Sequence, residues 1–128
     1  MKRILVLCTG NSCRSQIAEG YLKHFAKEKA KVYSAGIETH GVNPKAIAAM
    51  KELGYDLSKH DSKSLDEVKA YAPFDAVVTM GCGDACPWMP AKKIIDWQIP
   101  DPKNMEPAAF NEVRDLIKEK VRELLNDL

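Results

Sequence analysis

Apolar residues along the chain fall into two patterns, short continuous runs and longer stretches with helical spacing. The continuous runs, which are typical of buried strands, cover residues 3–7, 31–35, 74–80 and 93–96. Between residues 15 and 29, Ile17, Tyr21 and Phe25 recur every four positions, which predicts an amphipathic helix.

Three more helices are predicted after the second strand. Asn43 is typical of an N-cap with Pro44 in the first turn, and Gly54 ends that helix. Ser64 and Glu67 have the spacing of a capping box, which indicates the start of a short helix. The last helix begins at Pro107, and its apolar stripe consists of Phe110, Val113, Ile117, Val121 and Leu124.

The alternation of strands and helices predicts an α/β fold, a three-layer sandwich with helices on both faces of a four-stranded parallel sheet. Strands that are buried on both faces have continuous apolar character. Because crossovers are right-handed, the simplest strand order is 2-1-3-4, and ligands are expected beyond the carboxyl ends of the strands, beside the first one. We expect residues 1–128 to form one domain.

The overall charge is close to neutral, with a formal net charge of +1. This balance argues against bulk electrostatic binding to nucleic acid or to an anionic membrane. The apolar run near the N-terminus is too short for a signal peptide or a membrane span. We therefore expect a cytoplasmic monomer without a cofactor or metal, in which the four cysteines are reduced.

The first strand runs into a polar loop in which Cys8 and Arg14 have C-x5-R spacing, and a helix follows from Ser15. Backbone N–H groups of such a loop can surround a tetrahedral anion, and the helix N-terminus adds positive potential. Arg14 can bind two anion oxygens through its planar guanidinium. The same environment favours a thiolate at Cys8, so Cys8 is the candidate nucleophile and Ser15 can hydrogen-bond its sulfur.

The loop itself supplies the candidate oxyanion-binding residues. These are Thr9, Gly10, Asn11, Ser12, Cys13 and Arg14. Gly10 permits backbone angles that a side chain would forbid, whereas the Cys13 side chain is expected to pack. The nucleotide-binding motif G-x-x-x-x-G-K-[ST] is absent from the sequence.

Two further cysteines, Cys82 and Cys86, follow the third strand at the edge where Cys8 ends the first. Neighbouring strands lie about 4.8 Å apart, so Cys82 can approach Cys8 after modest loop movement. Residues four apart on a helix have Cβ atoms about 5–6 Å apart, so a disulfide between Cys82 and Cys86 needs the segment to bend. The alternatives are packing thiols or zinc ligands, although paired C-x2-C spacing is missing.

Asp101 lies between two prolines, in a loop with few conformations to lose on folding. A general acid must reach the leaving oxygen from the side opposite the nucleophile, and a separate loop can provide it. Asp and Pro are also common turn residues, so the sequence alone leaves open that Asp101 only starts a turn.

The segments CTGNSCRSQIAEG and VYSAG, with Asp101-Pro102, resemble the low-molecular-weight tyrosine phosphatase superfamily, and within it the thioredoxin-coupled arsenate reductases. The resemblance covers nearly the whole chain. It implies the four-stranded parallel sheet, with Cys8 as nucleophile, Arg14 as oxyanion ligand and Asp101 as proton donor. It also implies that Cys8 attacks arsenate, that Cys82 then attacks Cys8 and releases arsenite, and that Cys86 moves the disulfide to where thioredoxin reduces it.

A phosphatase is the alternative function, because phosphoester hydrolysis needs only the first thiol, and weak phosphatase activity is expected in either case. Arsenate reduction needs two electrons, which a pair of thiols supplies. Thr9, the lack of an aromatic residue after Asp101-Pro102 and the two extra thiols favour the reductase. A non-catalytic oxyanion or redox sensor would lack the nucleophile or the acid. Only three residues separate Cys82 from Cys86, fewer than in better-known reductases of the group, which leaves the reductant open.

Some relatives hold potassium behind the loop with residues that match Asn11, Glu19 and Ser34. The fourth ligand there is an acid, whereas the matching position here is Lys63. We therefore predict that the ammonium group of Lys63 replaces the ion. The three histidines, His24, His40 and His60, are interpreted as solvated.

Overall fold

The computed structural model describes residues 2–8, 13–36, 41–58, 60, 63–80 and 91–127. The strands are β1 (Lys2–Cys8), β2 (Ala30–Gly36), β3 (Phe74–Thr79) and β4 (Ala91–Asp96). The α-helices are α1 (Arg14–Ala26), α2 (Pro44–Lys51), α3 (Leu65–Val68) and α4 (Pro107–Asp127). Single 3-10 turns, η1 (Lys27–Lys29) and η2 (Lys69–Tyr71), follow α1 and α3.

The strands form one parallel sheet in the order β2-β1-β3-β4, which confirms the predicted order. At the carboxyl edge, Cys8 pairs with Gly36 of β2. One residue earlier, Leu7 pairs with Thr79 of β3, which in turn pairs with Asp96 of β4. The carboxyl ends of all four strands therefore lie along one edge of the sheet, where ligands of this fold class bind.

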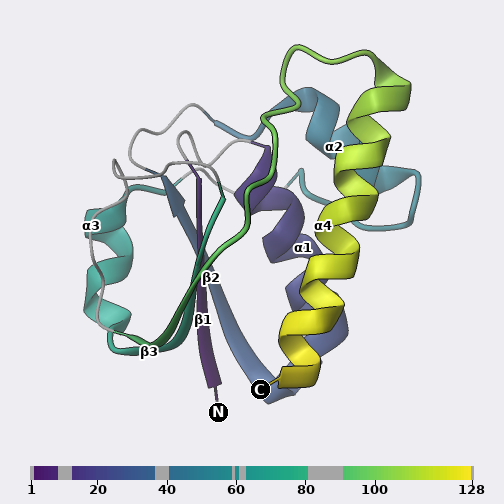
Figure 1. Ribbon diagram of the computed structural model, residues 1–128. Coiled ribbons are helices and arrows are strands. Elements are labelled where there is room, and N and C mark those ends of the chain that lie inside the picture. The colour runs from purple at the N-terminus through teal and green to yellow at the C-terminus, as the bar shows by residue number, and fades with distance from the viewer. Residues whose placement is uncertain are drawn as a thin grey trace.

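Helices cover both faces of the sheet, as predicted (Figure 1). Alternate residues of β1 enter two separate buried clusters: Ile4 and Val6 pack in the larger one together with residues of α1 and α4, and Leu5 and Leu7 pack in the smaller one with Val68 of α3. The central strand is thus buried on both sides, which explains its continuous apolar run. No helix within the described residues combines the length and the apolar composition that crossing a membrane requires.

The long C-terminal helix α4 buries the predicted stripe. All five residues of this stripe belong to the larger cluster: Phe110, Val113, Ile117, Val121 and Leu124. Full burial of one such side chain stabilises the fold by about 1.5–3 kcal/mol. This stripe therefore holds α4 against α1 and fixes the end of the β4–α4 segment that leads into α4.

Several element boundaries differ from the predictions: α2, for example, ends at Lys51 rather than at Gly54. Helix α1 ends at Ala26 rather than near residue 29, because Lys27 adopts a left-handed φ of 52° and the chain turns there toward β2. Strand β4 begins at Ala91, two residues before the predicted start. Ala91 pairs with Phe74 through the backbone ladder, which needs no apolar run.

Candidate active site

Cys8 is the last residue of β1 and is buried. Its Sγ lies 2.9 Å from Oγ of Ser15, which is fully buried in the first turn of α1. The β-ladder fixes one partner of this contact and the helix fixes the other. The structure therefore holds a hydroxyl group against the sulfur of the predicted nucleophile, where it can donate a hydrogen bond to a thiolate.

Arg14 begins α1, and its guanidinium group is buried close to the carboxyl edge of the sheet. Nη1 donates a hydrogen bond of 3.0 Å to the carbonyl oxygen of Ile99. Nη2 lies 3.9 Å from Oδ2 of Asp101. A buried charge needs partners. Within the described residues, the partners of the Arg14 guanidinium are one neutral carbonyl and one carboxylate that lies beyond hydrogen-bond distance.

Asp101 lies in the segment between β4 and α4, and its side chain is 40% exposed. Oδ1 accepts a 3.1 Å hydrogen bond from the backbone N–H of Lys103, whereas Oδ2 faces Arg14. The sequence left open whether Asp101 starts a turn or acts as an acid. The geometry is compatible with both roles, because one carboxylate oxygen closes the turn and the other faces the candidate oxyanion site.

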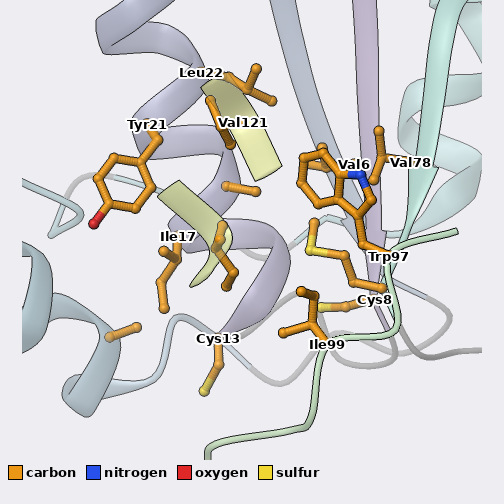
Figure 2. Packing of buried hydrophobic residues seen from close by; sticks show 14 of the residues in the cluster. Val6, Cys8, Cys13, Ile17, Tyr21, Leu22, Val78, Trp97, Ile99 and Val121 are labelled. Carbon is orange, nitrogen blue, oxygen red and sulfur yellow. The ribbon is translucent and has the colours of Figure 1, made fainter. Parts of the chain in front are cut away.

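We refer to residues 97–106 as the acid strap. Within it, Ile99 donates its N–H to the carbonyl of Trp97, and Met105 donates to the carbonyl of Pro102, at 2.8 and 2.9 Å. Trp97 and Ile99 are buried in the larger cluster together with Cys8, and Figure 2 shows these side chains among its members. The start of the strap is therefore anchored in the core beside the candidate nucleophile.

Of the residues predicted to form a cation-like site, Ser34 and Lys63 lie around Glu19, whose side chain is only 1% exposed, and Asn11 is outside the described residues. Oγ of Ser34 donates a 2.9 Å hydrogen bond to Oε1 of Glu19, and Nζ of Lys63 lies 3.8 Å from the same oxygen. Nζ of Lys23 lies 3.3 Å from Oε2. Burial alone raises the pKa of this carboxyl group, but the His60 hydrogen bond and the charges of the two lysines and of His60 outweigh burial and lower the pKa to about 2.

His60 belongs to this cluster, and its interpretation as a solvated residue is wrong. Its side chain is only 15% exposed, and Nδ1 lies 3.0 Å from Oε1 of Gln16 and 3.4 Å from Oε1 of Glu19. Because both neighbours are acceptors, this geometry requires the hydrogen to be on Nδ1. No spacing signal points to this contact, since 44 residues separate His60 from Gln16. His24, in contrast, is exposed, as expected.

Several candidate residues lie outside the described part of the chain. These are Thr9, Gly10, Asn11, Ser12, His40, Cys82 and Cys86. Cys13 is described, and its side chain is buried in the larger cluster with Cys8, as the packing interpretation expects. Within the described ranges, no three His, Cys, Asp or Glu side chains gather as metal ligands. The described site thus consists of Cys8, Arg14, Ser15 and Asp101 at the sheet edge.

Comparison with known proteins gives a consistent picture. Arsenate reductase 2 of Staphylococcus saprophyticus is 47% identical over 130 residues, covering 98% of both chains. A structure described as an arsenate reductase in the phosphate binding state superposes with a TM-score of 0.91 at 38% identity, covering 99% of this chain and 98% of that chain. The thioredoxin-dependent arsenate reductase Cg_ArsC1' of Corynebacterium glutamicum superposes with a TM-score of 0.83 at 32% identity, covering 99% of this chain and 61% of that chain.

The family assignment follows from sequence alone. Residues 3–128 match the sequence pattern of the low molecular weight phosphotyrosine protein phosphatase family. The matched range includes the C-x5-R loop, the Glu19 cluster and the acid strap. The sheet order and the position of Cys8 at its carboxyl edge agree with this match. The chain therefore belongs to the low molecular weight phosphotyrosine protein phosphatase family.

Proposed function

We propose that this protein reduces arsenate to arsenite with thioredoxin as the source of electrons. The observation that carries the proposal is the meeting of three groups at one sheet edge. Cys8 contacts Ser15, and Arg14 lies between the carbonyl of Ile99 and the Asp101 carboxylate. These groups supply a nucleophile, an oxyanion ligand and a proton donor, and the relatives described above are arsenate reductases.

The first step is attack by the sulfur of Cys8 on arsenic. The Ser15 hydroxyl stabilises the attacking thiolate by a hydrogen bond. A sulfur–arsenic bond forms, and one arsenate oxygen leaves as water after it receives a proton from Asp101. Arg14 stabilises the remaining oxygens, and its hydrogen bond to Ile99 orients the guanidinium before the substrate binds.

The second step transfers two electrons to arsenic. The thiolate of Cys82 attacks Sγ of Cys8, a disulfide forms, and the sulfur–arsenic bond breaks with its electron pair staying on arsenic. As(V) thereby becomes As(III), which leaves as arsenite, while two thiols are oxidised to one disulfide. Cys86 then attacks Cys82 and releases Cys8 as a thiolate, and the two thiols of thioredoxin reduce the resulting disulfide.

The described strands support an approach of Cys82 to Cys8. The N–H of Met80 donates a 2.8 Å hydrogen bond to the carbonyl of Leu7, the residue before Cys8. Cys82 follows Met80 by two residues, and consecutive Cα atoms are about 3.8 Å apart, so its Cα lies within about 7.6 Å of that of Met80. A disulfide between Cys82 and Cys8 is therefore within reach of the short segment that follows Met80.

Two further features complete the proposal. A relay that starts from reduced thiols fits the cytoplasm, where thioredoxin and glutathione keep thiols reduced, and a monomer suffices because every proposed group comes from one chain. In the Glu19 cluster, the ammonium group of Lys63 takes the place of a potassium ion. This substitution supplies a cation to the buried carboxylate without an ion from solution.

The deciding experiment measures arsenate-dependent oxidation of NADPH with thioredoxin and thioredoxin reductase. We expect turnover by the native protein and loss of at least about a hundredfold for Cys82→Ser, because one thiol cannot supply two electrons. The Cys82→Ser variant still hydrolyses para-nitrophenyl phosphate slowly, since that reaction needs only the first thiol. Unchanged arsenate turnover in Cys82→Ser would disprove the relay.

A phosphatase is the second candidate, because Cys8, Arg14 and Asp101 would serve phosphoester hydrolysis equally well. In that case Cys8 forms a cysteinyl phosphate that water hydrolyses, and the later cysteines protect the nucleophile from oxidation. Fast hydrolysis of para-nitrophenyl phosphate together with no arsenate-dependent NADPH oxidation would establish this function instead.

A further inference from the structure

Long side chains from two helices, Arg14 of α1 and Lys45 of α2, hold the acid strap. On the sheet side, Arg14 donates to the carbonyl of Ile99 at 3.0 Å. On the α2 side, Nζ of Lys45 donates to the carbonyl of Lys103 at 2.8 Å and lies 3.5 Å from the carbonyl of Met105. The two Lys45 contacts span sequence separations of 58 and 60 positions. The strap thus connects the start of α1 with the start of α2.

Lys45 projects from a rigid point of the molecule. The side chain of Asn43 caps α2 by accepting a 2.8 Å hydrogen bond from the N–H of Lys45, and Pro44 occupies the first turn. Ala46, the next residue, is fully buried in the core. Because the backbone at Lys45 is fixed on both sides, its ammonium group is a fixed point for the strap.

Packing holds this end of the strap only in part. A mainly apolar hollow of about 140 Å³ lies between α2, α4 and the end of the strap. It is lined by Lys45, Ala48, Ala49, Glu52, Met105, Pro107, Phe110 and Asn111. Met105 is partly buried against the larger cluster and also lines the hollow, so packing constrains it on one side only. Hydrogen bonds from Lys45 therefore add a hold on the side where the hollow lies.

We propose that Lys45 is a positioning residue that sets the place of the Asp101 carboxyl group. Lys103 is the link, because its carbonyl accepts from Lys45 and its own N–H donates to Oδ1 of Asp101. Lys45 therefore acts on the acid through one residue and two hydrogen bonds. This inference rests on the proposed function, in which Asp101 protonates the leaving oxygen.

Three variants separate positioning from simple stabilisation. Lys45→Met keeps the aliphatic stem over the hollow and removes the donor, whereas Lys45→Arg keeps a donor. Lys51→Met, which removes an exposed lysine from the last turn of the same helix, is the matched control. In each variant, aryl phosphate hydrolysis is measured with para-nitrophenyl phosphate, which has a good leaving group, and with phenyl phosphate, which has a poor one.

A displaced acid harms the poor leaving group most, because that group needs the proton in the transition state. We expect Lys45→Met to lower kcat for phenyl phosphate by about tenfold and for para-nitrophenyl phosphate by less than about twofold. Lys45→Arg should recover most of the loss, and Lys51→Met should match the native protein. Equal slowing of both substrates by Lys45→Met would overturn the positioning role.

Hydrogen exchange tests the same inference without any reaction. The N–H groups of Lys103 and Met105 are hydrogen-bonded inside the strap, and we expect both to exchange about tenfold faster in Lys45→Met. Unchanged exchange would overturn the proposal whatever the protein catalyses. If exchange rises but Asp101→Asn leaves the leaving-group dependence intact, the proposed role of Asp101 fails while Lys45 is still shown to hold the strap.

Discussion

Helix α1 carries two buried charges, and their surroundings differ sharply. Glu19 accepts from Ser34 and lies near three basic groups, of which the nearest is Lys23 at 3.3 Å. Arg14, one and a half turns earlier, has as described partners the carbonyl of Ile99 and an Asp101 oxygen at 3.9 Å. One charge is thus compensated by internal partners, whereas among the described residues no carboxylate reaches the other within hydrogen-bond distance.

The difference separates a structural charge from a functional one. A buried charge whose partners are all internal contributes to folding, and removing a partner costs stability. A buried arginine with incomplete compensation has attraction left for an anion from solution. We therefore propose that Glu19 supports the fold and that Arg14 belongs to the oxyanion site.

The largest effect is expected from Arg14→Lys. Lysine keeps the charge but loses the planar fork, so it cannot bind two oxyanion oxygens at once or hold the Ile99 carbonyl in the same geometry. We expect kcat/KM for arsenate to fall by about 10²–10³-fold, with a change in the free energy of unfolding below about 1 kcal/mol. The coupled NADPH assay and urea unfolding measure the two quantities.

Arg122→Lys is the matched control, because Arg122 is a partly exposed arginine of α4 whose only described partners are Glu119 and the Phe25 ring. It should change neither quantity. A large loss of stability in Arg14→Lys with little loss of kcat/KM would reverse the assignment of the two charges.

Glu19→Gln should have the opposite profile. The substitution leaves Lys23, Lys63 and His60 facing a neutral amide, and we expect a cost of about 3 kcal/mol, the low end for a broken buried ion pair, because both lysines are partly exposed. We expect the urea midpoint to fall accordingly. Glu28→Gln, which changes an exposed carboxylate of η1, should leave the midpoint unchanged. An unaltered midpoint in Glu19→Gln would show that the cluster does not stabilise the fold.

The pH dependence of stability provides a smaller and independent measure of the same carboxylate. The pKa of Glu19 is lowered in the folded protein to about 2 from an ordinary value of 4.5. Stability from this group is therefore fully present above pH 4.5 and is lost as the pH falls toward 2. We expect native protein to lose about 3 kcal/mol more than Glu19→Gln over this interval, from urea titrations at each pH. Parallel curves for the two proteins would contradict the lowered pKa.

Much of this architecture could be predicted from the sequence, because its signals are local or periodic. The run before Cys8, the spacing from Cys8 to Arg14 and the stripe on α4 each depend on neighbouring positions. Parallel topology brings the carboxyl ends of the strands to one edge of the sheet, so the sequence alone predicts that Cys8 lies at this edge. The end of α1 could not be predicted, because the residue with the positive φ there is Lys27 and not a glycine, so the sequence has no signal for the turn.

The contacts that the sequence did not reveal join polar side chains from distant segments. His60 meets Gln16 across 44 residues, and Lys45 meets Lys103 across 58. Each is a single polar contact, so it leaves no repeat in the pattern of apolar residues. Such contacts depend on where packing has already placed two elements, and only the folded chain shows them.

The smallest expected effect concerns potassium. In the native protein, Nζ of Lys63 lies 3.8 Å from Oε1 of Glu19, so the carboxylate already has an ammonium group as its neighbour. Exchanging sodium for potassium at constant ionic strength should therefore change kcat/KM for arsenate by less than about twofold, since a cation would have to displace a tethered one. Lys63→Asp removes that ammonium group and adds a carboxylate, and we expect it to gain a potassium-dependent rise in thermal stability. Strong activation of the native protein by potassium would mean that Lys63 does not fill the place of the ion, and Glu19 would then resemble Arg14 in needing a partner from solution.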